Sequence, residues 1–206
     1  MIKIGITGGV GSGKSRILDE LKGKYGAAVY QADLIAHEVQ RPGEACYREV
    51  IERFGEEILN TDGTIDRSRL GAIVFNDSGE LEALNAIVHP AVNARILEDI
   101  EKEEKNGCRL FVLEAALLTD KIYHEMLDEI WYIHVEEEVR KDRLSATRGY
   151  SRERTEAMMA SQPKEAVFRK SCDRVIENSG DYEQTSRQIE AAVRAVLGTL
   201  ELCRRW

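Results

Sequence analysis

The sequence lacks the features that mark secreted, zinc-binding or membrane-spanning proteins. Its few cysteines lie far apart and form no CxxC pair, which argues against a zinc site and against a disulfide framework. No apolar run approaches the length of a membrane helix. The first apolar stretch meets glycine at Gly8, too soon for a signal peptide. We therefore expect reduced thiols, a cytoplasmic location and no membrane partner.

An excess of positive charge is also missing. The 206 residues include 29 Lys and Arg against 37 Asp and Glu, a formal net charge of −8. An acidic chain repels a nucleic-acid backbone unless its basic residues gather on one face, so we expect no nucleic-acid partner. No internal repeat or low-complexity segment is present, and nothing in the sequence indicates a protein partner.

What is present is an alternation of short apolar segments with helical ones. The alternation predicts an α/β fold, a five-stranded parallel sheet with helices on both faces, in which the second strand lies close to the first. The five predicted strands are Ile2 to Thr7, Ala27 to Gln31, Arg109 to Glu114, Ile130 to Val135 and Arg174 to Glu177.

Two helices can be predicted individually, one from the residues at its ends and one from its apolar face. One runs from Pro90 to Asn106, because proline suits the first turn and Gly107 suits the stop. The other runs from about Tyr182 to Leu200 and carries an apolar stripe that should pack on the sheet.

Two connections are much longer than a simple crossover needs, and long insertions at the carboxyl ends of strands are where α/β proteins bind substrates. We therefore expect one α/β domain over residues 1–206. Its parts are a core of residues 1–32, 107–135 and 172–206, a helical substrate-binding insertion at 33–106, and a second insertion, expected to form a lid, at 136–171.

The residues from Gly8 to Ser15 match the phosphate-binding pattern GxxxxGK[ST] directly after a strand and at the start of a helix. Glycines let successive N–H groups point at phosphate oxygens, and the helix amino terminus adds partial positive charge. Lys14 is placed for the β and γ phosphates of ATP, and the Ser15 hydroxyl for Mg²⁺. The predicted nucleotide-binding residues of this loop are Gly8, Gly9, Gly11, Ser12, Gly13, Lys14, Ser15 and Arg16.

Other nucleotide-binding classes fit less well. A dinucleotide fingerprint starting at Gly9 would need glycine at position 14, where Lys14 stands. The DxxG and NKxD strings of signalling GTPases and the LSGGQ string of ABC ATPases are absent from the chain. The remaining class is a small-molecule kinase.

Two further features favour a kinase. Asp33 follows the second predicted strand, where a carboxylate can orient an acceptor alcohol or take its proton; the alternative is a helix cap for the segment after it. The stretch from Arg140 to Arg154 is rich in arginine, and guanidinium groups can neutralise a phosphoryl group in transfer. Within this predicted lid, the catalytic candidates are Arg140, Arg143 and Arg148.

The chain resembles the dephospho-CoA kinase family along nearly its whole length. The stretches that carry the likeness are "GITGGVGSGKS", "ADLIAHEVQRPG", "FGEEILNTDGTIDRSRLGAIVF", "LNAIVHPAV", "ASQ" at residues 160–162, and "VIENSG". The resemblance implies a fold similar to nucleoside monophosphate kinases and transfer of the ATP γ-phosphate to the ribose 3′-hydroxyl of dephospho-CoA. It further implies that Asp33 takes that hydroxyl, that Arg69 and His89 lie on the acceptor side, and that Asn178 approaches adenine. For His89, capping of the helix at Pro90 is an equal alternative.

The chain also departs from the family pattern. Arg16 stands where the family usually has threonine, Gln31 where it has a second aspartate, and Thr147 and Met158 where it has arginines. Two alternatives therefore stay open beside dephospho-CoA kinase: a P-loop kinase for another nucleoside-like alcohol, and a diverged nucleotide-binding regulator with weak transfer activity.

Overall fold

The computed structural model describes residues 1–203, apart from the side chains of residues 147, 148 and 199–203. Contacts divide the chain into two compact units. Unit 1 comprises residues 1–30 and the chain from residue 103 onward, and unit 2 comprises residues 31–102. Within the described residues, no helix is both long and apolar enough to cross a membrane.

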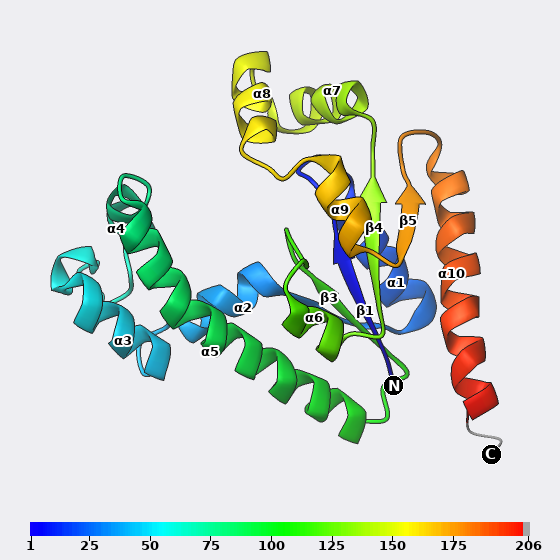
Figure 1. The fold of residues 1–206 in the computed structure, drawn as a ribbon, viewed down its shortest axis with the longest axis horizontal. Coiled ribbons are helices and arrows are strands. Elements are labelled where there is room, and N and C mark those ends of the chain that lie inside the picture. The colour runs from blue at the N-terminus through cyan, green and yellow to red at the C-terminus, as the bar shows by residue number, and fades with distance from the viewer. Residues whose placement is uncertain (204–206) are drawn as a thin grey trace. The chain divides into compact units, whose positions relative to one another are not determined.

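Unit 1 is built on a five-stranded sheet with the order β2-β3-β1-β4-β5 (Figure 1). Strand β1 pairs in parallel with β3 and β4, and β4 pairs in parallel with β5. The expected α/β fold is confirmed, but β3 lies between β1 and β2, so the expectation that the first two strands lie close together is wrong. The strands are β1 Ile2–Thr7, β2 Ala28–Gln31, β3 Leu110–Glu114, β4 Glu129–His134 and β5 Arg174–Glu177.

The sheet is covered on both faces because its strands carry apolar side chains on both. Ile4 and Ile6 face a core cluster with α1 and α10, whereas Gly5 points to the other face. A Cβ on Gly5 would lie 2.6 Å from Leu118, so the absence of a side chain lets the chain before α6 pack closely. The helices of unit 1 are α1 Lys14–Tyr25, α6 Lys121–Met126, α7 Glu137–Arg148, α8 Arg152–Ala160, α9 Glu165–Ser171 and α10 Tyr182–Cys203.

The apolar stripe of α10 packs as the sequence predicts. Ile189 and Val193 are at most 1% exposed, and Val196 is 6% exposed. They join β1, β4 and α1 in a single core cluster. The last residue of the predicted stripe, Leu200, lies outside the residues whose side chains are described.

Unit 2 is helical, with a capped helix α4 and a small core of buried side chains. Asp66 caps α4, since its carboxylate accepts hydrogen bonds from the backbone N–H groups of Ser68 and Arg69 at 2.9 and 3.1 Å. Buried side chains of α3, η1 and α4, among them Val50 and Ile58, form its core. The helices are α2 Ala32–Val39, α3 Ala45–Phe54, the 3₁₀ helix η1 Glu56–Ile58, α4 Arg67–Val74 and α5 Ser78–Lys105, which continues into unit 1.

Helix α5 begins twelve residues before the predicted start at Pro90. Asp77 caps it, accepting hydrogen bonds from Gly79 and Glu80 N–H at 2.8 and 3.3 Å. Pro90 therefore lies inside the helix, where its ring removes one backbone donor. The predicted end holds, because Gly107 follows with a left-handed φ of 75°.

Candidate functional site

The loop between β1 and α1 has the backbone geometry expected of an anion site. Gly11 and Gly13 have φ of 78° and 81°, which only glycine adopts without strain. Ser12 N–H donates to the Gly9 carbonyl at 3.2 Å and closes the turn. Gly13 directly precedes α1 and gives it no side-chain cap, so the partial positive charge of the helix amino terminus lies at the loop. This geometry suits a chain of phosphates.

Lys14 lies between the loop and the end of strand β3. Its Nζ donates to the Gly8 carbonyl at 2.7 Å and lies 3.4 Å from a carboxylate oxygen of Glu114. Both side chains are largely buried, with 16% and 12% exposed. They meet because β3 is the direct neighbour of β1 in the sheet. The ammonium therefore lies at the mouth of the loop, beside the carboxylate that ends β3.

Ser15 and Arg16 are exposed in the first turn of α1. The guanidinium of Arg16 stacks on the Tyr182 ring, 3.6 Å from its centroid. The Tyr182 hydroxyl donates to Glu20 at 2.8 Å, and burial together with this carboxylate raises the pKa of Tyr182. Arg16 is thus supported by α10, and its predicted nucleotide contact stays a prediction.

The loop residues fit a Mg²⁺ ion only in combination with a phosphate chain. The described residues contain no cluster of three or more His, Cys, Asp and Glu side chains that could hold a metal. Ser15 offers one exposed hydroxyl beside the loop. Mg²⁺ typically takes few protein ligands and completes its shell with phosphate oxygens and water, so this donor set is compatible with the predicted site.

Helix α7 forms one wall of the loop. The Arg140 Nε donates to the Val10 carbonyl at 2.9 Å, and Leu144 is buried beside it. A Cβ on Gly9 would lie 2.4 Å from the Arg140 guanidinium, and one on Gly11 would lie 3.0 Å from Leu144. These two glycines therefore also allow α7 to approach the loop, a reason that the motif alone does not reveal.

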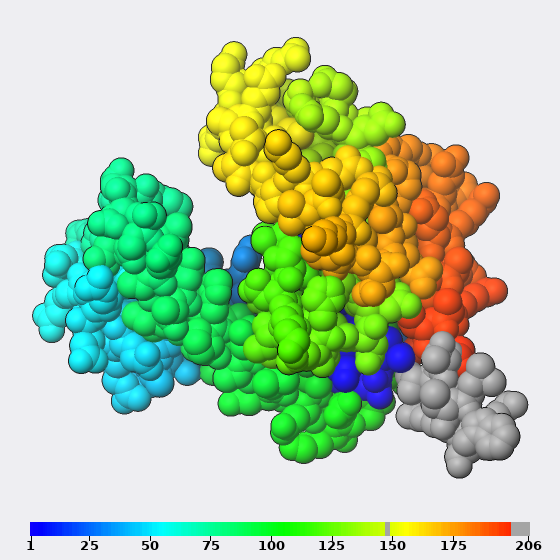
Figure 2. Space-filling model, viewed as in Figure 1, coloured from blue at the N-terminus to red at the C-terminus, as the bar shows by residue number. Residues whose placement is uncertain are grey.

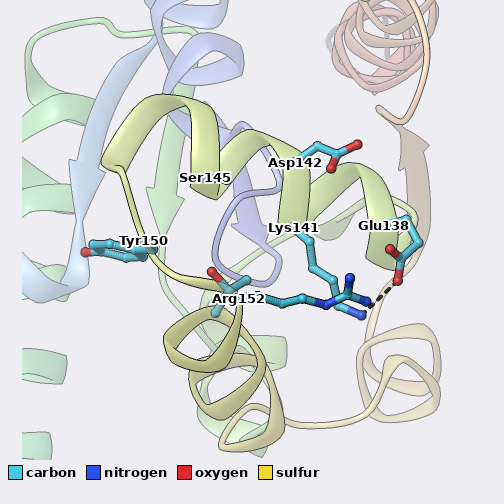
Figure 3. A pocket seen from close by; sticks show the side chains of 7 residues that line it. Glu138, Lys141, Asp142, Ser145, Tyr150 and Arg152 are labelled. Atoms are coloured by element: carbon cyan, nitrogen blue, oxygen red, sulfur yellow. Dashed lines mark hydrogen bonds and ion pairs between the residues drawn. The ribbon is translucent and has the colours of Figure 1, made fainter.

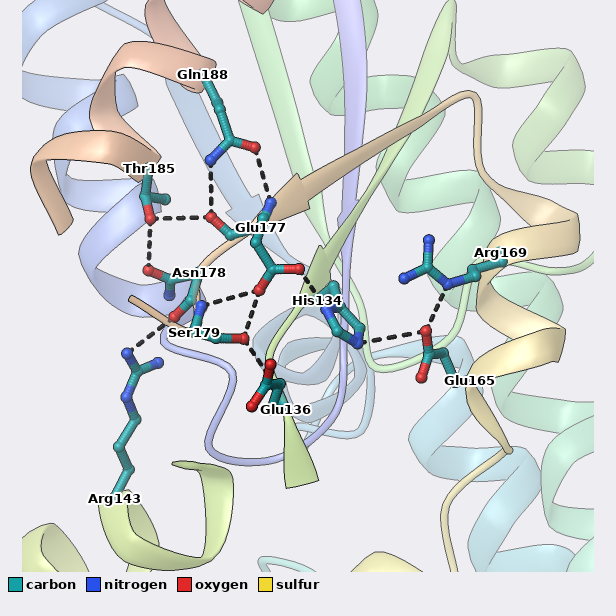
Figure 4. Close-up of polar contacts among 10 residues, drawn as sticks. All are labelled: His134, Glu136, Arg143, Glu165, Arg169, Glu177, Asn178, Ser179, Thr185 and Gln188. Carbon is teal, nitrogen blue, oxygen red and sulfur yellow. Dashed lines mark hydrogen bonds and ion pairs between the residues drawn. The ribbon is translucent and has the colours of Figure 1, made fainter. Parts of the chain in front are cut away.

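The loop is held on its other side by Asn178, which follows β5 (Figure 4). Its Nδ2 donates to the Ser12 carbonyl at 2.7 Å, and its Oδ1 accepts from the Thr185 hydroxyl at 2.9 Å. The Asn178 carbonyl accepts from Arg143 at 2.9 Å. Asn178 is 3% exposed, so its amide supports the loop; its predicted adenine contact stays a prediction.

Not all basic residues of the predicted lid reach the phosphate-binding loop. Arg140 and Arg143 reach the loop and its support, as described. Lys141 and Arg152 instead line a pocket of about 160 Å³ between α7 and α8 (Figure 3). These two helices pack side by side (Figure 2). There Lys141 pairs with Glu138 at 2.8 Å, and Arg152 pairs with Glu156 at 3.0 Å. The side chain of Arg148, the third predicted catalytic arginine, lies outside the described residues, as does that of Thr147.

The three predicted residues of unit 2 are described within that unit. Asp33 is exposed in the first turn of α2, whose N-cap is Gln31, so the alternative that Asp33 is the cap is wrong. Arg69 donates to the carbonyls of Glu57 and Leu59 at 3.1 and 2.9 Å. His89 is exposed within α5. Because α5 starts at Ser78, the alternative that His89 caps a helix at Pro90 is also wrong.

The central strand β1, the curled glycine loop, and Lys14 at the start of α1 define a P-loop kinase. Solved kinases share this fold, for example shikimate kinase from Acinetobacter baumannii, with a TM-score of 0.52 and 13% identity over 97% of this chain and 94% of that one.

More similar proteins specify the family. A family model described as dephospho-CoA kinase matches residues 2–184. The dephospho-CoA kinase of Carboxydothermus hydrogenoformans is 42% identical over 90% of this chain and 90% of that protein, and that of Symbiobacterium thermophilum is 40% identical over 95% and 81%. The crystal structure of TT1252 from Thermus thermophilus has a TM-score of 0.77 and 32% identity, covering 94% of this chain and 97% of that one. The chain belongs to the dephospho-CoA kinase family, as the resemblance of its motifs predicts.

Proposed function

We propose that the protein transfers the γ-phosphoryl group of ATP to the ribose 3′-hydroxyl of dephospho-CoA, giving ADP and coenzyme A. The observation that carries this proposal is the curled loop ending in Lys14 at the start of α1, in a chain of this family. Backbone donors and one ammonium at a helix amino terminus favour a polyphosphate donor.

In the proposed reaction, the 3′-oxygen forms a bond to the γ-phosphorus while the bond from that phosphorus to the β,γ-bridging oxygen breaks. Asp33 orients the attacking hydroxyl and accepts its proton. Lys14, with Arg140, Arg143 and Arg148, stabilises the charge on the transferring group. The Ser15 hydroxyl would help to hold Mg²⁺, which when bound neutralises phosphate charge. No covalent enzyme intermediate is required.

A coupled ADP-release assay tests the proposal. Dephospho-CoA is offered beside adenosine and several nucleoside monophosphates, each with ATP and Mg²⁺. We expect ADP release with dephospho-CoA alone. Release with another nucleoside-like alcohol would identify a different kinase. Tight ATP binding without release with any acceptor would identify a nucleotide-binding regulator.

A further inference from the structure

Two side chains from outside the P-loop motif hold the tip of the loop at Val10. Arg140 Nε donates to the Val10 carbonyl at 2.9 Å, and Arg140 Nη2 donates to Gln162 Oε1 at 2.7 Å. The same Gln162 oxygen accepts from Val10 N–H at 3.2 Å. Three hydrogen bonds thus close a ring that uses both backbone polar groups of Val10.

The orientation of the Gln162 amide follows from its neighbours. Val10 N–H and the Arg140 guanidinium are both donors, so only the amide oxygen can face them. One of the two bonds is charge-assisted and therefore stronger than a neutral bond. The ring is partly buried, and desolvation lowers the pKa of the Arg140 guanidinium.

Val10 lies between Gly9 and Gly11 in a loop that has few stiff residues of its own. Movement of the Val10 peptide therefore shifts the neighbouring N–H donors that would face the phosphates. Arg140 alone would fix the carbonyl side of this residue, whereas the N–H side depends on Gln162. Gln162 comes from the turn after α8, so the contact joins that turn to the loop.

We infer that Gln162 is a positioning residue for phosphoryl transfer: through Val10 and Arg140 it holds the loop tip in the shape that grips the donor phosphates. The expected change in the KM for ATP rests on the proposed function, whereas the expected change in the Kd for ATP does not. Gln162 contacts the loop and Arg140, so it acts through them rather than on the reacting atoms.

The test compares Q162M with Q184M in the full-length protein. Methionine keeps the length of the side chain and removes the acceptor, and Gln184 is an exposed glutamine of α10. We expect Q162M to raise both the Kd for ATP and the KM for ATP at least about fivefold, the scale of one lost neutral hydrogen bond. The KM for dephospho-CoA should change less than about twofold, and Q184M should match the wild type.

General destabilisation would lower the fraction of active enzyme, but it would not raise the KM for ATP more than the KM for dephospho-CoA. The thermal midpoint checks folding, and Q162N, which keeps the amide but shortens its reach, replaces Q162M should that variant unfold. In a double-mutant cycle, adding Q162M to R140M should weaken ATP binding less than adding it to the wild type does, because the two side chains share a bond in one ring. An unchanged Kd for ATP in Q162M, or additive effects in the cycle, would overturn the inference. Absence of transfer in the wild type would instead refute the proposed function and leave the Kd comparison valid.

Discussion

At the scale of single residues, the side chains that hold the phosphate-binding loop in place differ from those that are expected to bind phosphate. Lys14 and the glycines belong to a motif that the sequence displays in full, and in the structure they form the curled loop before α1. Asn178 and Gln162 reach the same loop from distant parts of the chain through their amide groups. No spacing rule links them to the motif, so the sequence alone could name Asn178 only by resemblance and gave Gln162 no role.

Asp33→Asn separates proton acceptance from nucleotide binding. The amide has the same size but cannot take the proton of the acceptor hydroxyl, so turnover should fall at least about a hundredfold. The affinity for ATP should remain nearly unchanged, because Asp33 is assigned to the acceptor rather than to the nucleotide. Steady-state kinetics and nucleotide titration measure the two effects. Turnover equal to that of the wild type would remove Asp33 from its proposed role.

Asn178→Ala tests the support of the loop on the side of β5. The change leaves the Ser12 carbonyl without the Asn178 amide, whereas the Thr185 hydroxyl loses Asn178 but still donates to the Glu177 carbonyl at 3.0 Å. Losing a buried partner of this kind costs about 1–3 kcal/mol. We expect the free energy of unfolding to fall by about 2 kcal/mol or more, measured by denaturant titration. T185V keeps the bond from Asn178 to Ser12 and removes the two bonds of the Thr185 hydroxyl, to Asn178 and to Glu177, so it measures the Thr185 side alone. A loss below about 1 kcal/mol in Asn178→Ala would mean that the bond to Ser12 contributes little.

At the scale of helices and strands, the segment after α8 is tied to the sheet by a polar cluster. His134 ends β4, with Nδ1 2.6 Å from Glu177 and Nε2 3.3 Å from Glu165 of α9 (Figure 4). Tyr132 stacks on Phe168 of the same helix, with ring centroids 4.9 Å apart. These contacts fix α9 on β4 and thereby fix the end of the segment that carries Gln162.

This anchoring should weaken in acid. The hydrogen bond from Arg169 holds the pKa of Glu165 below its usual 4.5. Burial alone would raise the pKa of Glu177, but hydrogen bonds with Ser179 and His134 hold this pKa below 4.5 as well. Carboxyls with depressed folded-state pKa values contribute stability that is complete above about pH 4.5 and is lost as the pH falls through the folded-state pKa.

The measurement is the free energy of unfolding between about pH 6 and pH 3. E165Q should flatten part of its decline, modestly because Glu165 is 49% exposed. The control is E82Q, because Glu82 is an exposed residue of α5 with no ion pair among the described residues. This variant should leave the decline in the free energy of unfolding unchanged. An unaltered pH dependence in E165Q would contradict the assigned role of the cluster.

Element boundaries follow from the sequence where a local signal dominates. The strands agree with the prediction to within one residue at each end, because apolar β-branched runs end at polar or turn residues. The start of α5 was missed because proline at a first turn is only a preference, while Asp77 followed three residues later by Glu80 is the stronger cap signal. The order of strands in the sheet is not carried by such patterns, which is why the place of β2 was predicted wrongly.

At the scale of the whole molecule, the two compact units correspond to two binding tasks in the proposed reaction. The loop and its supports belong to unit 1, where every contact described for them lies. The residues assigned to the acceptor, Asp33, Arg69 and His89, belong to unit 2. Arg69 already stabilises its unit by bonding two carbonyls of the η1 turn, so its loss would affect unit 2 before any ligand is considered.

Hydrogen exchange can test this division of tasks. A ligand that binds the folded state suppresses local opening where it binds. A non-hydrolysable ATP analogue alone should slow exchange around residues 8–16 and in α7, and dephospho-CoA alone should slow exchange mainly within residues 33–106. R69M should reduce the second effect and leave the first intact, because Arg69 makes its described contacts only within unit 2. Protection of unit 1 alone by dephospho-CoA would contradict the acceptor-binding role of residues 33–106. Protection of unit 2 alone by the ATP analogue would contradict the assignment of the loop as the site for ATP.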